Sequence, residues 1–490
     1  MSKSIAVIGS GFSGLSASCF LAAAGQNVTV YEKNDSLGGR ARQFKVDGYT
    51  FDMGPSWYWM PDIFEDFFNK FGKSTKDYYE LIRLDPSYRI YFGKNDIMDL
   101  PASEEGLFEL FESYEKGSST HLKKFLEEGA YKYEVGIKDL VYKPSKSLTE
   151  FIDLRLMTGV LKLHVFQSIS KYIRKYFKNP KLIQLLEFPV LFLGAMPDKT
   201  PALYSLMNYA DMSLGTWYPK GGMYKIVEGM SDLAKSLGVN FELSANVEKL
   251  ELEANKAQGL RINGKSIPSD YIVGSADYHH IEQNLLPASA RKYNADYWEK
   301  RTMAPSSLIF YLGVNKQIGN LLHHNLFFDE DFPAHAKEIY EDPKWPSKPL
   351  FYVCCSSKTD PTAAPEGCEN VFILVPVAPG LKDEESIREE YYDLVMERLE
   401  KLTGESIKEH VVYKRSYAHN DFIGDYNSFK GNAYGLANTL RQTAILKPSL
   451  HSKKVKNLFY TGQLTVPGPG VPPSIISGEV VAKEVLKVLN

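Results

Sequence analysis

The stretch Ser4-Ile5-Ala6-Val7-Ile8-Gly9-Ser10-Gly11-Phe12-Ser13-Gly14 decides the fold of this chain. An apolar run that predicts a β-strand leads directly into three glycines with the spacing G-x-G-x-x-G, and helix-like sequence follows. Gly9 permits a tight turn, Gly11 lets the backbone approach a pyrophosphate, and Gly14 lets the helix pack close to the sheet. The stretch therefore predicts a helix whose N-terminus faces the phosphates of a dinucleotide.

A second strand-like run, Val28-Thr29-Val30-Tyr31, ends at Glu32. An acidic side chain at this place would accept hydrogen bonds from the hydroxyls of a ribose. Glycines with this spacing often form only a tight turn, so the motif by itself is weak evidence. The flanking strands and the acid favour a dinucleotide site over a simple turn.

Length and composition limit the class of protein. A chain of 490 residues exceeds one simple core and predicts two or more domains. Hydrophobic content of 44% and charged content of 24% are ordinary for a globular protein, and the net charge of −3 argues against a nucleic-acid partner. The four cysteines have neither metal-ligand spacing nor disulfide density, which favours a reducing compartment and predicts no metal. Cys354 and Cys355 are expected on opposite sides of one strand.

The N-terminal region could be mistaken for a signal peptide, because Lys3 is followed by apolar sequence that ends in Ala22-Ala23-Ala24. The glycines and Glu32 explain the same residues better, and cleavage near Ala24 would remove the cofactor strand. No run approaches the roughly 18 apolar residues that span a bilayer. We expect a cytoplasmic protein that does not span the membrane.

The order of strand-like and helix-like segments predicts an α/β fold whose cofactor domain is assembled from separate pieces. Strand-like sequence recurs at 239–274 and 457–460, and a long helical section runs from about 103 to 212. We assign 1–84, 216–280 and 446–490 to the cofactor domain, 85–102 and 281–445 to a substrate domain with a mixed sheet, and 103–215 to a helical insertion.

Three further motifs combine glycine with arginine or aromatic residues. Gly38-Gly39-Arg40 could bring backbone and arginine to a phosphate, or could be a tight turn with a solvated arginine. In Gly54-Pro55-Ser56-Trp57-Tyr58-Trp59 the three rings cannot all face one core, so some are expected to line a cavity for a conjugated apolar ligand. Trp217-Tyr218-Pro219-Lys220-Gly221-Gly222 repeats this theme, with a plain turn as an equal alternative.

The closing loop, Thr461-Gly462-Gln463-Leu464-Thr465-Val466-Pro467-Gly468-Pro469-Gly470-Val471-Pro472-Pro473-Ser474, joins a strand-like run to a final helix expected over 473–489. Proline near the first turn suits a helix start. The free N–H groups of that turn carry partial positive charge, which would stabilise a reduced flavin anion. A loop of this composition has few purely structural needs.

Together these motifs resemble the FAD-dependent carotenoid desaturases, the phytoene-desaturase-like branch of the amine-oxidase-like flavoproteins, over nearly the whole chain. The resemblance rests on the glycine loop with Glu32, GGRAR at 38–42, FDMGPS at 51–56, LDPSYRIYF at 84–92, WYPKGG at 217–222, GNAYGL at 431–436 and TGQLTVPGPGVPPSIISG at 461–478. It implies bound FAD in a glutathione-reductase-like Rossmann domain and removal of two hydrogens from neighbouring carbons of a polyene.

Departures from the family pattern narrow the substrate. Phytoene desaturases of this group usually have His where Val466 stands and Gly where Pro473 stands, and they lack the cluster at 57–59. The chain looks like the bacterial branch that desaturates the 3,4 bond of 1-hydroxylated carotenoids such as 1'-hydroxy-γ-carotene, with phytoene as an alternative substrate.

The resemblance also implies which residues contact the ligands. The cofactor contacts are Gly9, Gly11, Ser13, Gly14, Glu32, Lys33, Gly39, Arg40, Gly54, Pro55, Ser56, Val247, Gly462, Val471 and Pro472, and the substrate contacts are Trp57, Tyr58, Trp59 and Trp217. No catalytic residue and no metal ligand is assigned, and His279-His280 is expected in a loop.

The expected step is transfer of a hydride to flavin N5 with loss of a proton from the neighbouring carbon, and a quinone or oxygen would reoxidise the flavin. A carotenoid isomerase that uses reduced FAD and an enzyme that oxidises a terminal methyl are alternatives on the same fold. A prenyl-binding escort of the Rab GDP-dissociation-inhibitor type is a third alternative, against which the intact glycine loop and the closing loop argue.

A carotenoid dissolves in the bilayer, so an enzyme that acts on it must contact a membrane. Residues 155–186 contain no acidic residue. The apolar residues Val165, Ile169, Ile173 and Phe177 recur there at roughly helical spacing. Basic residues interleave with them: Arg155, Lys162, Lys171, Arg174, Lys175, Lys178 and Lys181. Basic amphipathic helices bind anionic lipid, whereas a core helix with a solvated basic face would look similar. We expect residues 155–195 to form a monotopic membrane contact and a substrate gate, which makes the protein peripheral on the cytoplasmic membrane.

Overall fold

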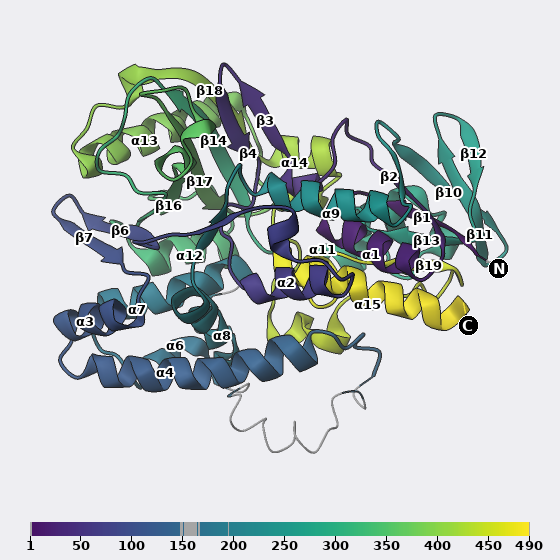
Figure 1. The fold of residues 1–490 in the computed structure, drawn as a ribbon, viewed down its shortest axis with the longest axis horizontal. Coiled ribbons are helices and arrows are strands. Elements are labelled where there is room, and N and C mark those ends of the chain that lie inside the picture. Colours follow the sequence, from purple (N-terminus) through teal and green to yellow (C-terminus); the bar gives the residue numbers. More distant parts are fainter. Residues whose placement is uncertain (1, 148–149, 151–163, 165–166, 195, 490) are drawn as a thin grey trace.

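The first sheet is parallel and is built from segments far apart in the sequence. The computed structural model describes residues 2–147, 150, 164, 167–194 and 196–489 (Figure 1). The sheet has the strand order β19-β13-β1-β2-β9. The strands are β1 (Ser4–Ile8), β2 (Asn27–Tyr31), β9 (Asn240–Glu242), β13 (Tyr271–Gly274) and β19 (Leu458–Tyr460). This assembly from separate pieces matches the expectation, whereas the exact domain boundaries stay a prediction.

Two helices pack face to face beside this sheet, and small residues set their distance. Helix α1 (Phe12–Ala23) follows the glycine loop, and α15 (Val471–Leu489) follows the closing loop. A Cβ on Gly478 would lie 2.4 Å from the Ser13 carbonyl oxygen, so only glycine permits this approach. The Ser16 hydroxyl donates to the Ile475 carbonyl (2.7 Å). The first and last helices of the described chain thus hold the cofactor sheet together.

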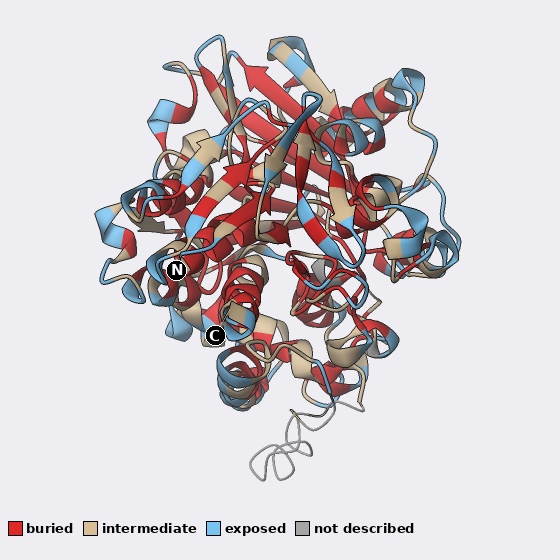
Figure 2. Cartoon of the chain, turned by 90° about the vertical axis from the view of Figure 1, so that its right-hand side faces the viewer, coloured by how far each residue is buried: buried red, intermediate tan, exposed pale blue. Residues whose placement is uncertain are grey.

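The second sheet is mixed, with the order β18-β14-β17-β16-β15-β6-β7. Its strands are β6 (Tyr88–Gly93), β7 (Asp96–Leu100), β14 (Ser306–Val314), β15 (His324–Phe327), β16 (Phe351–Cys354), β17 (Glu369–Val377) and β18 (Val411–Tyr417). Ile309 and Tyr311 of β14 belong to one hydrophobic cluster, while Leu308 and Phe310 belong to another. Because side chains alternate along a strand, the sheet separates two cores. Figure 2 shows buried strands through the middle of the molecule. Cys354 and Cys355 fall in different clusters, as predicted.

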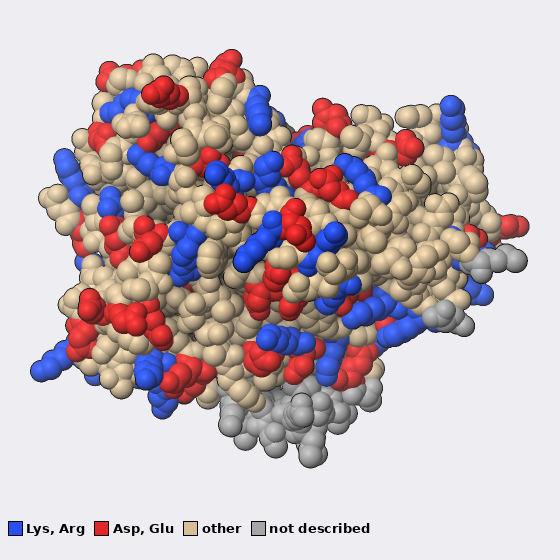
Figure 3. Space-filling model, viewed as in Figure 1, with Lys and Arg blue, Asp and Glu red and all other residues tan. Residues whose placement is uncertain are grey.

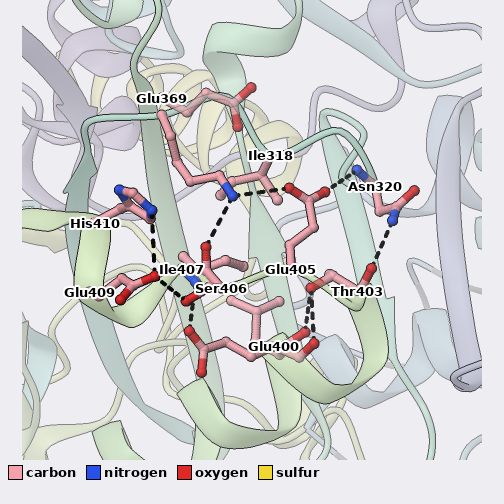
Figure 4. Close-up of polar contacts among 12 residues, drawn as sticks. Ile318, Asn320, Glu369, Glu400, Thr403, Glu405, Ser406, Ile407, Glu409 and His410 are labelled. Atoms are coloured by element: carbon pink, nitrogen blue, oxygen red, sulfur yellow. Dashed lines mark hydrogen bonds and ion pairs between the residues drawn. The ribbon is translucent and has the colours of Figure 1, made fainter.

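Helix α13 (Glu385–Thr403) covers the outer face of this sheet, and its C-terminal end is fastened by side chains. The Asn320 amide donates to the Thr403 carbonyl (2.7 Å), and Glu405 accepts from the Asn320 backbone N–H (2.9 Å) (Figure 4). Glu400 accepts from the backbone N–H of Ile407 (2.6 Å). None of these residues lines the cavity described below, so they stabilise the helix on the sheet rather than a ligand.

Smaller sheets complete the strands. An antiparallel sheet contains β10 (Val247–Glu253), β11 (Lys256–Ile262) and β12 (Lys265–Pro268). Two antiparallel pairs join β3 (Gln43–Val46) to β4 (Tyr49–Asp52) and β5 (Leu81–Arg83) to β8 (Trp217–Pro219). The last pair brings the aromatic motif at 217–222 beside the segment that precedes β6.

A layer of helices lies below the mixed sheet in the view of Figure 1. It includes α3 (Glu104–Tyr114), α4 (Ser118–Tyr133), α6 (Ile169–Ile173), α7 (Pro180–Glu187) and α8 (Leu206–Tyr209). Ile169, Ile173 and Phe177 are completely buried, so the expectation that they form the apolar side of a membrane surface is wrong. Arg155, Lys162 and Val165, the other part of that prediction, lie outside the described residues. Among the described helices, none has the length and apolar character needed to cross a bilayer.

Candidate functional site

One large cavity, with about 2330 Å³ of empty space partly continuous with solvent, brings most of the predicted motifs together. Its lining includes the predicted cofactor residues Gly9, Gly11, Ser13, Glu32, Lys33, Gly39, Arg40, Gly54, Pro55, Ser56, Val247, Gly462, Val471 and Pro472. It also includes Trp57 and Trp59. The cavity reaches from the glycine loop of the parallel sheet to the inner face of the mixed sheet.

The glycine loop presents backbone donors and open space to this cavity. Gly9 has a left-handed φ of +97°, and its N–H donates to the Tyr31 carbonyl (2.8 Å), which fixes the turn. Gly11 is the N-cap of α1 and has no side chain to accept the first free N–H groups. A Cβ on Gly11 would meet no atom within 4 Å, whereas a Cβ on Gly39 would lie 3.3 Å from the Gly11 Cα. Free N–H groups beside an open space fit a phosphate group.

Gly14 does not line the cavity, and its role is packing. A Cβ at this position would lie 2.2 Å from the Gly9 carbonyl oxygen and 2.9 Å from the Ser275 hydroxyl. The position therefore admits only glycine, for the reason that the spacing predicts.

Glu32 is buried at the end of β2 and fastens the glycine loop. One carboxylate oxygen accepts from the backbone N–H (3.0 Å) and the hydroxyl (2.6 Å) of Ser10. The other oxygen accepts from the backbone N–H (2.9 Å) and the side-chain amide (3.0 Å) of Asn34. Its predicted contact with ribose hydroxyls would be added to these bonds or exchanged for one of them.

Arg40 provides a partly buried cation whose Nε is a buried, unused donor. Its Nη2 donates to the Ser428 hydroxyl (3.0 Å), while its Nε has no hydrogen-bond partner among the described residues. The guanidinium lies 5.1 Å from the centre of the Tyr426 ring. Burial raises the pKa of Asp277, another cavity residue, to about 6, and Arg40 opposes this rise. An orphaned guanidinium N–H near the glycine loop fits an anionic ligand, so these residues suit the pyrophosphate of a dinucleotide.

The remaining predicted cofactor residues form the rim and the far wall. The Lys33 ammonium donates to the Gly424 carbonyl (2.6 Å), and burial lowers its pKa. Val247 lines the cavity together with Ala245 and Asn246. Helix α15 begins at Val471, two positions before the expected start, so that Pro472 lies in its first turn and the helix N-terminus faces the cavity.

The aromatic motif divides between the cavity and the core. The Trp59 indole donates to the Thr216 hydroxyl (2.8 Å), and the Trp57 ring stacks on His324 at 4.1 Å between ring centres. Tyr58 is 0% exposed, and its hydroxyl lies 3.0 Å from that of Tyr79. It does not line the cavity, because the alternation of side-chain directions turns the middle ring into the core, and its contact with substrate stays a prediction.

Trp217 does not line the cavity either, so its contact with substrate also stays a prediction. Its indole N–H donates to the Leu214 carbonyl (2.9 Å), and the Arg83 guanidinium lies 5.5 Å from the ring centre. Gly221 and Gly222, which follow it, lie in a plain turn, the alternative that the sequence allowed. The Asp52 carboxylate closes this turn by accepting from the Met223 N–H (2.7 Å). The expected loop at His279-His280 is also wrong, because both residues lie in the short helix α10 (Tyr278–His280).

Sequence reasoning missed much of the apolar wall. The additional lining residues include Met207, Ile309, Tyr352, Leu374, Ala433 and Tyr434. Only Ala433 and Tyr434 lie in a motif quoted above, the stretch at 431–436. The others come from strands and helices whose sequence patterns indicate burial and carry no signal of a ligand, since sheet pairing alone brings them together.

Residues 12–486 match the family described as flavin containing amine oxidoreductase. The chain is 41% identical over 486 residues to a carotenoid 3,4-desaturase of Haloarcula japonica, covering 99% of this chain and 98% of that protein. It is 32% identical over 496 residues to a 4,4'-diapophytoene desaturase of Staphylococcus aureus, covering 99% and 98%. A solved oxidoreductase of Methanosarcina mazei has the same fold, with a TM-score of 0.64, 16% identity, and coverage of 98% and 99%.

Proposed function

The chain belongs to the flavin containing amine oxidoreductases, within which it is a member of the FAD-dependent carotenoid desaturase family, and we propose that it desaturates the 3,4 bond of a 1-hydroxylated carotenoid such as 1'-hydroxy-γ-carotene. The observation that carries the proposal is 41% identity to a carotenoid 3,4-desaturase along almost the entire length of both chains. The aromatic wall with Trp57 and Trp59 supports it independently, because a rigid conjugated chain packs well between flat rings.

The protein residues would hold FAD along the polar half of the cavity. The free N–H groups at the N-terminus of α1 and the Arg40 guanidinium would bind the pyrophosphate, and Glu32 would fix the loop beneath it. The flavin would lie towards Gly54 and the N-terminus of α15 at Val471. When bound, FAD supplies the acceptor for a hydride, which we assign to its N5 position, and a quinone or oxygen would accept the electrons afterwards.

The apolar half would hold the polyene in place and keep water out. Met207, Ile309, Leu374 and the tryptophans offer no strong acid or base to a substrate. The conjugated chain itself spreads the positive charge that develops as hydride leaves, so positioning and dryness are the main tasks of these side chains.

The mass of the product tests the proposal. FAD-loaded enzyme is incubated with 1'-hydroxy-γ-carotene and, in parallel, with phytoene. A product of the first substrate that has lost two hydrogens and absorbs at longer wavelength is expected. Conversion of phytoene alone would replace the proposal with phytoene desaturation, an unchanged mass would indicate an isomerase, and added oxygen would indicate oxidation of a terminal methyl. Protein that binds no flavin would favour the prenyl-binding escort.

We also propose that the helical layer contacts the membrane through exposed lysines rather than through its apolar residues. Lys171, Lys175 and Lys178 are exposed around α6, and each is worth about 1 kcal/mol near an anionic bilayer. On the face in Figure 3, basic and acidic side chains are interspersed, so a local cluster would have to provide this attraction.

Co-sedimentation with phosphatidylglycerol vesicles tests the membrane contact. Replacing the three lysines by glutamate is expected to abolish binding. The matched control replaces Lys249, Lys256 and Lys265, exposed on the small antiparallel sheet, and is expected to bind normally. Equal binding by both variants, or no binding of the unmodified protein, would contradict the proposal.

A further inference from the structure

His323, His324 and Cys354 form a buried cluster at the edge of the candidate site that no motif indicated. His324 opens β15 and is the register partner of Cys354 in β16. One ring nitrogen of each histidine and the Cys354 sulfur all lie within 4.8 Å of one another. The three residues are between 0% and 7% exposed. Polar groups removed from water to this degree need partners.

Hydrogen bonding fixes His324 in the tautomer that a metal ion requires. The Tyr352 hydroxyl donates its single proton to the Ser56 hydroxyl (2.9 Å), so it must accept from the His324 Nδ1, which lies 2.6 Å away. The His324 Nε2 is then an unprotonated lone pair, and it has no partner among the described residues. A metal-binding histidine typically donates its other ring N–H to an oxygen atom, as His324 does to the Tyr352 hydroxyl, and leaves the remaining nitrogen for the ion.

His323 has a similar arrangement. The His323 Nδ1 lies 2.7 Å from the Thr359 hydroxyl, which leaves its Nε2 for another partner. The Cys354 sulfur reaches the same cluster from the neighbouring strand, opposite His324 in register.

We propose that His323, His324 and Cys354 bind one thiophilic transition-metal ion of the zinc class. Two imidazoles and one thiolate are typical zinc ligands, and alkaline-earth ions prefer oxygen. A small cavity lined by His323, Cys354, Asp52 and Ser356 leaves room for a water as the fourth ligand. The sequence predicts no metal, because the ligands are 30 positions apart and only the pairing of β15 with β16 joins them.

The ion would act on structure rather than on chemistry. It would fasten β15 to β16 and hold the His324 ring against Trp57, and it would orient Tyr352, whose hydroxyl reaches Ser56 on the cavity wall. The site would therefore fix the shape of the aromatic half. This inference does not depend on which carotenoid the protein desaturates.

The test uses the FAD-loaded full chain after treatment with a chelator. Co²⁺ and then Zn²⁺ are titrated by calorimetry and absorption, and one ion per chain with a cobalt–thiolate charge-transfer band is expected. X-ray absorption of the zinc form is expected to show two nitrogens at about 2.0–2.1 Å and one sulfur at about 2.3 Å. Failure to bind one ion, or a coordination sphere without sulfur, would overturn the proposal in the unmodified protein.

Variants locate the site. Cys354→Ser and His324→Gln are expected to weaken Co²⁺ binding by more than the roughly 10- to 100-fold typical of a supporting residue. The matched control is Cys355→Ser, which changes the adjacent buried thiol in the opposite core and is expected to keep both stoichiometry and spectrum. Flavin content and circular dichroism report whether each variant folds. Equal metal binding by folded Cys354→Ser and by the control would overturn the assignment.

Discussion

The two halves of the cavity are built in opposite ways. The polar half is made by backbone, with N–H groups at the start of α1 and glycines at Gly9, Gly11 and Gly39 that leave room for a ligand. The aromatic half is made by side chains such as Trp57, Tyr352 and Leu374, which converge from separate strands and loops. In a backbone-built site an added side-chain atom either meets fixed backbone or takes the space that a ligand needs, whereas a side-chain-built site changes its shape gradually. The halves should therefore respond differently to mutation.

The largest effect is expected from Gly14→Val behind the polar half. Its first added carbon would lie 2.2 Å from a backbone oxygen that has no freedom to move, so folded flavoprotein should be lost. Soluble yield and flavin absorbance measure this. The control is Gly424→Ala, since a Cβ there meets nothing within 4 Å. Normal flavin content in Gly14→Val would mean that the glycine loop can shift, and would contradict the view that the backbone of the polar half is rigid.

Glu32→Arg should abolish flavin binding with the chain still folded. The change removes four hydrogen bonds that fix Ser10 and Asn34 and places a cation where a carboxylate was. Bonds to a charged group contribute about 1.5–3 kcal/mol each, so a drop in FAD affinity of at least about 100-fold is expected. Glu32→Gln, which keeps part of the bonding, should lose less. Undiminished affinity in Glu32→Arg would remove this residue from the cofactor site.

Trp57→Ala should affect the aromatic half of the cavity and leave the polar half unchanged. The variant is expected to keep FAD. Its kcat/KM for the carotenoid should fall at least about tenfold, because the aromatic half is enlarged. Tyr58→Phe is the neighbouring control. It removes the hydrogen bond to Tyr79 at a cost of about 1 kcal/mol of stability and should leave turnover unchanged. Steady-state kinetics and thermal unfolding measure the pair. Loss of turnover in Tyr58→Phe alone would reverse the assignment of the rings.

The smallest effect is expected at Lys447, which lies beside the closing loop, since a Cβ on Gly468 would be 2.9 Å from its Nζ. Its ammonium is buried without a partner among the described residues, and burial lowers its pKa from 10.5 to about 7. Between pH 7 and pH 10.5 the Lys447 amine is protonated in the unfolded chain and largely neutral in the folded chain. The free energy of unfolding should therefore rise from pH 7 to pH 9. Lys447→Met should be at least as stable at pH 7 and should lose this slope in chemical denaturation. An unchanged dependence of stability on pH in Lys447→Met would mean that other groups cause it.

The sequence predicts the polar half well because its chemistry is local. Three glycines and an acid within 24 residues determine a strand, a turn, a helix and the next strand, and the spacing itself carries the function. Tyr58 and Trp217 show where such reasoning ends, since an aromatic residue beside a glycine motif turns to core or cavity according to packing with Tyr79 or Arg83. Tyr352 and Leu374 could not be found, because only the register of the mixed sheet brings them to a ligand.

Strand β19 forms an edge of the parallel sheet beside β13, and its late position in the sequence has a consequence for biosynthesis. A ribosome that has released the first 450 residues has delivered β1, β2, β9 and β13, but neither the edge strand nor α15, which packs on α1. Long-range parallel pairing of this kind forms late. A chain that terminates before β19 and α15 is therefore expected to stay apo and to become a substrate for proteolysis.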